Sequence, residues 1–302
     1  MLKDYLRLHF IVLLWGFTAI LGKLISLPPV ELVFWRTLLA SVGLLGLLLM
    51  RRQSWQVGLA DAARLLGVGA LVAAHWITFF LAARLSSVSV CLAGMATLAL
   101  WTSLLEPLVL WRPVRFYEVG LGLLTMVGLY IVSQAELNQL LGLSVAIVSA
   151  GLSALFSVLN SKFVKRHTPT RLTFYEMTGA CLSIMLFLPF YGRYFTNGTG
   201  LQLALHGNDW WLLLVLAGVC TVYAFSASVE LMKRISAFVV NLTINLEPVY
   251  GILLAVYFFQ EKMSPGFYVG TAIILFSVLI HPVLDQWNKR RQRQPAAAEV
   301  LV

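Results

Sequence analysis

Long apolar segments, each about the length of one membrane crossing, fill most of this 302-residue sequence. A bilayer core about 30 Å thick is crossed by roughly 20 helical residues, because an α-helix rises about 1.5 Å per residue. By that length the sequence predicts ten spans, at residues 7–26, 30–50, 64–83, 86–108, 115–133, 141–160, 171–190, 210–230, 236–258 and 264–284. The fold class is therefore predicted to be all-α, a polytopic membrane protein with ten transmembrane helices.

The composition favours the same class. Of all residues 60% are hydrophobic and only 12% are charged, with a mean hydropathy of +0.85. Soluble domains carry roughly a quarter charged residues, so this chain has too few charges to cover a surface that faces water. The lipid bilayer is thus an expected partner. The three cysteines fall inside predicted spans at spacings that suit neither a disulfide framework nor a metal site, so no metal or cofactor is expected.

The basic residues are distributed unevenly along the chain. If both termini lie on one side, that side holds 17 of the 22 basic residues, the other side holds three, and two lie within spans. This asymmetry is the positive-inside signal, so both termini are predicted to be cytoplasmic, in what we expect to be a bacterial inner membrane. Topology alone explains the net charge of +9 and the basic tail "NKRRQRQ", and no nucleic-acid partner is expected.

Three pairs of segments recur in the same order in the two halves of the chain. They are "GFTAILG" with "GLSALFS", "PVELVFWR" with "PTRLTFYE", and "RLSSVSVCL" with "RISAFVVNL", at 16–22 and 151–157, 29–36 and 169–176, and 84–92 and 234–242. They indicate a duplicated five-helix unit over residues 1–138 and 139–285, followed by a basic cytoplasmic tail at 286–302. Because five is odd, the second copy is predicted to be inverted, as in many secondary transporters.

The sequence also resembles a known family. The segments "LLWGFTAILGK", "FWRTLLA", "LEPLVLWRPVRFYEVGLGLLTMVGLYIV" and "LTINLEPVYGILLAVYFFQEKMSPGFYVGTAIILFSV" are similar to the EamA-type families of the drug/metabolite transporter superfamily. That resemblance covers about residues 5 to 284. It implies ten helices in two inverted repeats, a central cavity, and export of amino acids or other small metabolites. It does not fix the substrate.

Polar residues gather in the ninth predicted span, in "VNLTINLEPVYG" at 240–251. Pro248 lacks an N–H and is predicted to kink the helix, which frees the carbonyl of Ile244. Such backbone is tolerated at this depth only inside protein or beside water. The stretch is thus predicted to line a cavity, with Glu247 facing it. Asn241 and Asn245 fit either a cavity wall or hydrogen bonds to neighbouring helices.

Further ionisable groups lie within the other spans. Arg36 and Glu176 hold matching repeat positions and follow aromatic residues, which suits entry sites for a zwitterion; a salt bridge or an interface anchor is the alternative. His75 is a second candidate beside Glu247 for proton coupling, although a hydrogen-bonded helix contact would also explain it. Six aromatic residues complete the predicted cavity wall or serve as packing: Trp15, Trp76, Trp101, Tyr175, Tyr223 and Tyr250.

The fourth predicted span contains a second Glu-Pro pair. Glu106 and Pro107 lie nearer the cytoplasmic end than Glu247 does, so Glu106 is predicted to pair with Arg112 or Arg115 rather than to bind a substrate. Pro107 is a second candidate for a helix kink.

Together these features predict a secondary carrier that exports a small amino-acid-like or amphipathic metabolite by alternating access. No Walker-type glycine loop occurs, so a gradient would drive transport. The alternatives are an intramembrane enzyme acting on lipid, a receptor or assembly protein, and, within the carrier class, a nucleotide-sugar or drug carrier. An enzyme is disfavoured because the "HExxH" and "GxSxG" motifs are missing and the histidines are scattered. No catalytic residue is expected, and the oligomeric state stays open.

Overall fold

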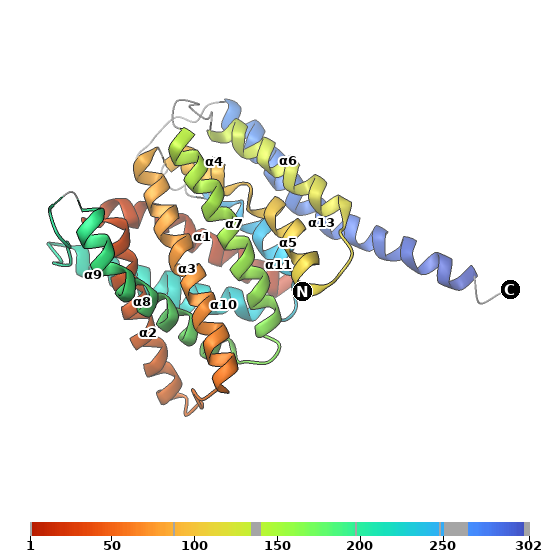
Figure 1. The fold of residues 1–302 in the computed structure, drawn as a ribbon. Coiled ribbons are helices and arrows are strands. Elements are labelled where there is room, and N and C mark those ends of the chain that lie inside the picture. The colour runs from red at the N-terminus through yellow and green to blue at the C-terminus, as the bar shows by residue number, and fades with distance from the viewer. Residues whose placement is uncertain are drawn as a thin grey trace.

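The structure, a computed structural model, describes residues 2–86, 88–133, 140–196, 198–247, 249–250 and 265–298. Every regular element within these ranges is a helix (Figure 1). In chain order they are α1 (Leu2–Leu24), α2 (Pro29–Met50), α3 (Leu59–Leu85), α4 (Val88–Met95), α5 (Leu98–Leu110), α6 (Phe116–Ser133), α7 (Leu140–Phe163), α8 (Pro169–Tyr194), α9 (Asp209–Ala217), the π-helical segment η2 (Gly218–Tyr223), α10 (Ala224–Leu231), α11 (Ala237–Ile244) and α13 (Pro265–Ala298).

Seven of these helical stretches are long and apolar enough to cross a membrane. They are Leu2–Gly22, Pro29–Met50, Leu59–Leu85, Leu140–Phe163, Pro169–Tyr194, Asp209–Leu231 and Tyr268–Asn288. Each corresponds to one of the ten predicted spans. The predicted span 115–133 forms the shorter α6, which is apolar from Phe116 to Ile131, and the span 236–258 extends beyond the described residues. Large apolar side chains on the outer faces, such as Leu186 on α8 and Leu279 on α13, are exposed, as lipid contact requires.

The predicted span 86–108 is divided into two helices. α4 ends at Met95, Ala96 and Thr97 form a turn, and α5 begins at Leu98. α11 in the second half likewise ends in a turn, formed by Asn245 and Leu246. The segments 84–92 and 234–242 of the two repeats are 150 residues apart. The same shift superimposes the two turns to within one residue. A broken helix at this position is therefore a feature of both halves.

Proline does not account for both breaks. Pro248 lies outside the described residues, and α11 already ends before it, at Ile244. In the first half, Pro107 lies in the last turn of α5, ten residues beyond the break at Thr97. The Thr97 hydroxyl donates to the Gly94 carbonyl at 2.8 Å, which satisfies one backbone acceptor that the break leaves over.

α3 and α8 approach each other closely through two glycines. A Cβ atom on Gly69 would lie 2.2 Å from the carbonyl oxygen of Glu176, and a Cβ atom on Gly179 would lie 2.3 Å from that of Leu66. Neither position has room for a side chain. The two helices therefore pack backbone against backbone, as small residues allow in membrane proteins.

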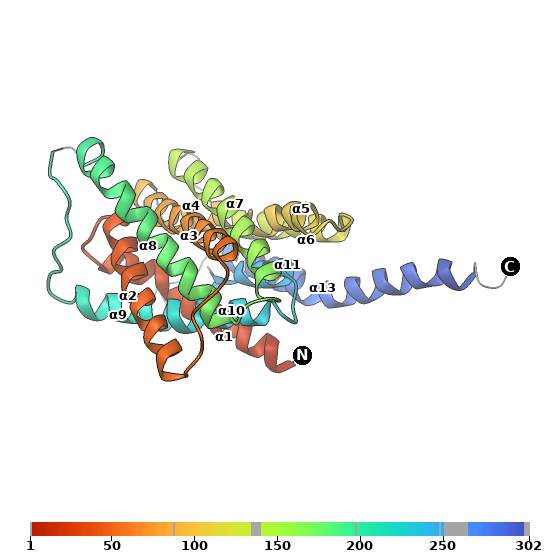
Figure 2. The same cartoon turned by 60° about the horizontal axis from the view of Figure 1, so that its bottom comes forward.

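α6 and α13 form a second close pair, side by side in Figure 1. The hydroxyls of Thr125 and Ser277 are hydrogen-bonded at 2.9 Å. A Cβ atom on Gly128 would lie 3.0 Å from the carbonyl oxygen of Gly270, so the two helices pack closely at these glycines. Beyond residue 285, α13 continues as a helix to Ala298 and projects from the bundle (Figure 2).

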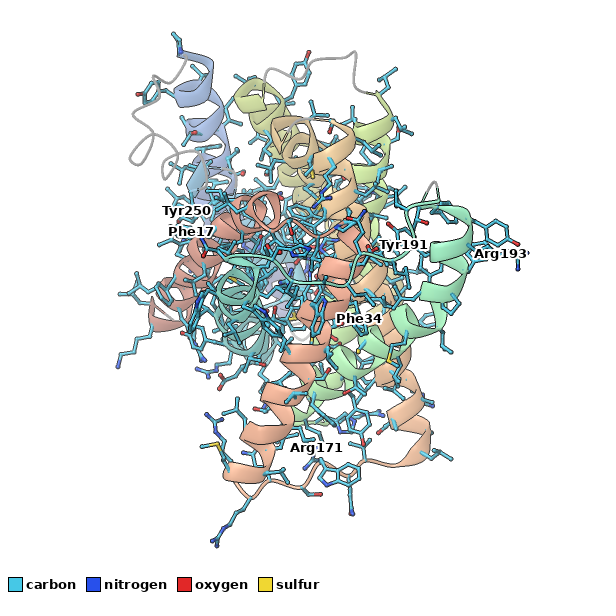
Figure 3. The ribbon with its side chains drawn as sticks, turned by 90° about the vertical axis from the view of Figure 1, so that its left-hand side faces the viewer. Phe17, Phe34, Arg171, Tyr191, Arg193 and Tyr250 are labelled. Carbon is cyan, nitrogen blue, oxygen red and sulfur yellow. The ribbon has the colours of Figure 1, made fainter. Side chains whose placement is uncertain are left out.

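The two halves exchange equivalent contacts. α3 of the first half packs against α7 and α8, and the corresponding helices of the second half, α9 and α10, pack against α2 and α1 respectively. α5 also packs against α11, which is the counterpart of α4. In Figure 3, Arg171 and Arg193 lie at opposite ends of α8. Helices from both halves therefore surround the centre of the molecule.

Candidate functional site

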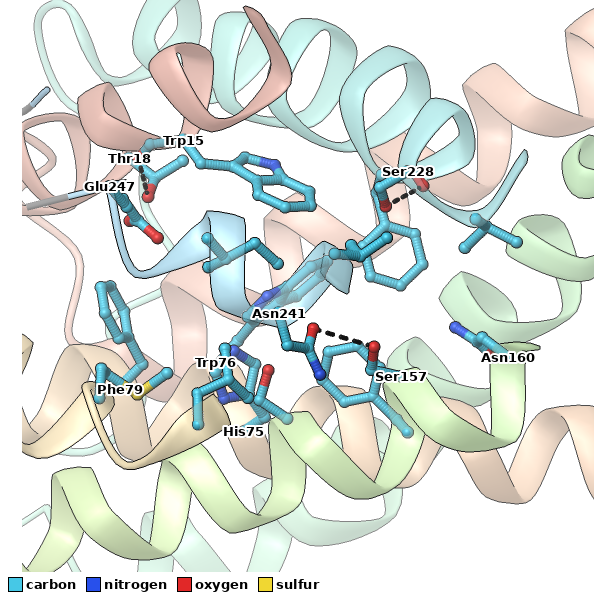
Figure 4. A pocket seen from close by; sticks show the side chains of 18 of the residues that line it. Trp15, Thr18, His75, Trp76, Phe79, Ser157, Asn160, Ser228, Asn241 and Glu247 are labelled. Atoms are coloured by element: carbon cyan, nitrogen blue, oxygen red, sulfur yellow. Dashed lines mark hydrogen bonds between the residues drawn. The ribbon is translucent and has the colours of Figure 1, made fainter. Parts of the chain in front are cut away.

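A cavity of about 80 Å³ lies at this centre, with room for several water molecules (Figure 4). Helices α1, α2, α3, α4, α5, α7, α10 and α11 all contribute to its wall. Six of the twelve side chains predicted to form a site line it: Trp15, Arg36, His75, Trp76, Asn241 and Glu247. The cavity thus joins groups that are more than 200 residues apart in the sequence.

Arg36 supplies the positive charge in the wall. Its side chain is 3% exposed, its Nε donates to the Thr221 hydroxyl at 2.9 Å, and its guanidinium lies 3.6 Å above the Trp76 ring. Thr221 belongs to η2 and donates in turn to the Leu216 carbonyl, five residues earlier, at 2.9 Å. π-helical turns of this kind occur frequently at functional sites. A hydrogen bond and a cation–π contact therefore hold Arg36 in one orientation.

Glu247 supplies the acidic group in the wall. It lies beside Thr18 (Figure 4) and is partly exposed to the cavity. Glu247 and Arg36 attract each other electrostatically, yet no ion pair within 4 Å joins them among the described residues. A basic and an acidic side chain therefore line one cavity without direct contact between them.

Asn241 combines the two roles that its sequence position leaves open. Its side-chain oxygen accepts a hydrogen bond from the Ser157 hydroxyl at 3.0 Å, and its Nδ2 donates to the Thr102 hydroxyl at 2.8 Å. These bonds connect α11 to α7 and α5, while the amide also lines the cavity. Asn245 is 3% exposed and lies at a smaller space next to Glu247 and Leu92.

His75 is held between two helices. Its Nδ1 lies 2.9 Å from the Ser149 hydroxyl oxygen, and that hydroxyl donates to the His75 carbonyl at 2.9 Å. The alternative of a hydrogen-bonded helix contact is therefore confirmed, and the imidazole lines the cavity as well.

The other predicted site residues lie elsewhere. Trp101 and Tyr223 are 39% and 43% exposed, Tyr175 packs edge-on against Phe174, and the Tyr250 hydroxyl lies 2.7 Å from His9 Nδ1. Glu176 is fully buried on α8 but outside the cavity wall. The acid in the same cavity as Arg36 is thus Glu247, and not the residue that matches Arg36 in the repeat.

Several lining residues were missed at the sequence level. α7 contributes Ser153, Phe156, Ser157 and Asn160. Ser149, Ser153 and Ser157 recur every four residues, which places them along one face of a helix. That spacing is visible in the sequence and could have identified α7 as a wall of the cavity.

Glu106 forms the interfacial pair that its position predicts. Its carboxylate lies 3.2 Å from Arg112, which also contacts Glu118 at 2.8 Å. The same Glu106 oxygen accepts a hydrogen bond from the backbone N–H of Phe238 at 3.0 Å. Glu106 thus ties α5 to the first turn of α11, away from the cavity.

The fold and the cavity define a class, that of helical membrane proteins built around an internal chamber lined by aromatic, aliphatic and a few polar side chains. The chain belongs to the EamA-like transporter family, whose model matches it twice, over residues 5–134 and 140–281. The family consists of transporters, and transport across a membrane implies a small-molecule substrate and a lipid bilayer as partners.

Two further similarities agree with this assignment. An uncharacterized transporter of Archaeoglobus fulgidus (strain ATCC 49558 / DSM 4304 / JCM 9628 / NBRC 100126 / VC-16) is 25% identical over 157 residues. The match covers 52% of this chain and 53% of that protein, so the chain spans about half the length of the curated relative it matches. A crystal structure described only as that of a protein superimposes with a TM-score of 0.75 at 17% identity, over 93% of this chain and 98% of the other, and shows the same fold.

Proposed function

We propose that this protein is a secondary transporter that exports a small zwitterionic, amino-acid-like or amphipathic metabolite by alternating access. The observation that carries the proposal is the placement of Arg36 and Glu247 in one cavity without an ion pair between them. A zwitterion presents one charge of each sign and can occupy the space between the two side chains.

Recognition would divide between charged and apolar contacts. Arg36 would bind the carboxylate of the solute, since a guanidinium offers paired donors that match a carboxylate. Glu247 would bind the ammonium group. Trp15, Trp76 and Phe79 line the same space and would contact an apolar or aromatic side chain of the solute. The same aromatic wall also suits an amphipathic solute.

Alternating access would use two inverted five-helix units, residues 1–138 and 139–285, with the basic tail 286–302 and both termini in the cytoplasm. The exchanged contacts between the halves and the matched breaks in α4–α5 and α11 support a two-fold relation of this kind. Inverted repeats of secondary transporters place the substrate where the repeats meet, near the middle of the bilayer. The central cavity fits that position.

Transport would run on a gradient. Glu247 is the first candidate for coupling to protons because it is an ionisable group in the wall of the cavity. His75 is the second candidate, since its imidazole also lines the cavity.

The proposal is tested with purified protein and candidate solutes. Thermal-shift screening against amino acids, nucleosides and amphipathic cations identifies a ligand, because a ligand at a hundredfold excess over its dissociation constant adds about 2.7 kcal/mol to stability. Counterflow of the radiolabelled ligand into proteoliposomes then measures transport, with protein-free liposomes as the control. We expect a zwitterionic amino acid to stabilise the protein and to be exchanged. A purified protein that exchanges none of these solutes would contradict the proposal.

A further inference from the structure

Glu176 is an ionisable group that does not line the cavity. It lies on α8, is 0% exposed, and neither of its carboxylate oxygens has a hydrogen-bond partner among the described residues. Arg36, at the matching position of the first repeat, has both a hydrogen-bond partner and an aromatic partner. Glu176 therefore differs from its repeat mate in lacking both an aromatic partner and a completed hydrogen bond among the described residues.

Two polar neighbours share this lack of partners. The Thr173 hydroxyl, one helical turn before Glu176, is fully buried and has no partner in the described part of the chain. The Asn160 amide on α7 is near enough to influence the Glu176 carboxylate electrostatically, but neither its oxygen nor its nitrogen completes a hydrogen bond. Three buried polar side chains are thus left without the bonds that such groups ordinarily make.

The charged and titratable groups on the neighbouring helices are engaged elsewhere. Arg36 on α2 donates to Thr221, His75 on α3 binds Ser149, and Glu230 on α10 pairs with Arg7 at 2.8 Å. Near the start of α3, Asp61 and Arg64 pair with each other at 3.1 Å. Arg84 in the last turn of α3 donates to the Leu27 carbonyl, and Lys162 on α7 is exposed. No ion pair joins Glu176 to a positive charge among the described residues. A buried carboxylate in this setting is stable only as the neutral acid.

Asn160 connects Glu176 to the cavity. It lines the chamber near Ser157 and Ser228 (Figure 4), and it is also the residue that acts on the Glu176 carboxylate. A proton leaving Glu176 thus has a polar group between it and any water in the cavity. Within the described part of the chain, no group of three or more His, Cys, Asp or Glu side chains surrounds Glu176 as a metal ion would require, whereas a proton needs only the carboxyl.

We propose that Glu176 is a proton-binding site, loaded in this conformation, that exchanges its proton with the central cavity through Asn160. When the helices move so that Asn160 and Glu176 meet water or a partner, the carboxyl releases its proton; when they return, it takes one up. The site is separate from Glu247. A role for it in driving transport rests on the proposed function, whereas proton binding itself does not.

Infrared spectroscopy of the purified protein in lipid vesicles tests the site without a substrate. A protonated carboxyl has its own C=O stretching band, which shifts when its proton is replaced by deuterium. Every sample carries Glu247→Gln, because Glu247 is the other carboxyl considered for proton binding. In that background we expect the parent protein at neutral pH to show such a band and Glu176→Gln to lack it. Glu31→Gln is the matched control, since Glu31 is also fully buried but accepts a hydrogen bond from the Gln202 N–H at 3.3 Å, and it should retain the band. Melting temperatures establish that both variants are folded.

The connection to the cavity is tested by exchange. After transfer to deuterated buffer, the rate at which the Glu176 band shifts is measured with Asn160 present and with Asn160→Leu. We expect Asn160→Leu to slow the shift at least several-fold while keeping the band. A band that survives in Glu176→Gln overturns the proposal, and so does one that sodium ions abolish at constant pH, which would indicate a metal-cation site. If these spectra come out as expected while no solute is transported, the proton site stands and the proposed function fails.

Discussion

Arg36 is held by contacts that leave its charge in the wall of the cavity. Thr221 and the Trp76 ring fix its orientation, and no carboxylate neutralises it directly among the described residues. If it binds the solute carboxylate, replacing it with glutamine removes a charged hydrogen bond of about 1.5–3 kcal/mol. We expect Arg36→Gln to raise the dissociation constant of the ligand by about tenfold or more, measured by isothermal titration. Arg64→Gln, an exposed residue paired with Asp61, is the control. Equal affinities in both variants would exclude Arg36 from binding.

Glu247 allows a separate test at the same scale. Glutamine keeps its size and hydrogen-bonding capacity but cannot exchange a proton. If Glu247 couples transport to protons, Glu247→Gln should abolish the pH dependence of flux in proteoliposomes. An unchanged flux and pH profile would reject its coupling role and leave His75 as the remaining candidate in the cavity wall.

Sequence reasoning identified which residues were unusual but not where each one faces. A charge inside a span is costly, so Arg36, Glu176 and Glu247 stood out from the residue type alone. Their directions depend on details that periodicity does not contain. At 100° per residue, Asn241 and Glu247 would occupy different faces of an unbroken helix. Because α11 ends at Ile244, both side chains reach the same cavity.

At the scale of the helices, length and apolar character predict the spans. Membrane thickness sets their length, and the hydrocarbon interior requires apolar side chains. The internal breaks were only partly predicted. Pro248 indicated an irregular ninth span, whereas nothing comparable marks the break at Ala96 and Thr97, because turns of this kind depend on tertiary contacts as well as on local sequence. The matched position of the two breaks shows that the duplicated unit, rather than a single proline, determines them.

The close crossing of α3 and α8 gives a prediction at this scale. Gly69 and Gly67 lie on the same helix, but a Cβ atom at Gly69 would lie 2.2 Å from a backbone oxygen, whereas a Cβ atom at Gly67 would have nothing within 4 Å. Overpacking costs about 1–3 kcal/mol. We expect Gly69→Ala to lower the melting temperature in detergent by several degrees, and Gly67→Ala to leave it unchanged or raise it, because alanine favours a helix. Similar melting temperatures for the two variants would contradict the backbone contact.

At the scale of the molecule, the repeats and the charge asymmetry together predict how the chain lies in the membrane. If each copy contains five membrane-crossing helices, the second copy enters the membrane from the opposite side. With both termini in the cytoplasm, Arg166 lies on the cytoplasmic side and Arg193 on the outer side. Both are exposed, and they flank α8 near its two ends. The basic residues near Arg166 agree with that assignment.

Single cysteines at these two positions test the topology directly. In the background protein the three native cysteines, which are all buried, are replaced by alanine: Cys91, Cys181 and Cys220. In intact bacterial cells whose outer membrane admits small reagents, a membrane-impermeant maleimide should label Arg193→Cys and should leave Arg166→Cys unlabelled until the inner membrane is opened. The reverse pattern would place the termini outside, and labelling of both in intact cells would mean that α8 does not cross. The first result would contradict the predicted orientation of the chain. The second would remove the inverted arrangement of two five-helix halves on which the proposed alternating access depends.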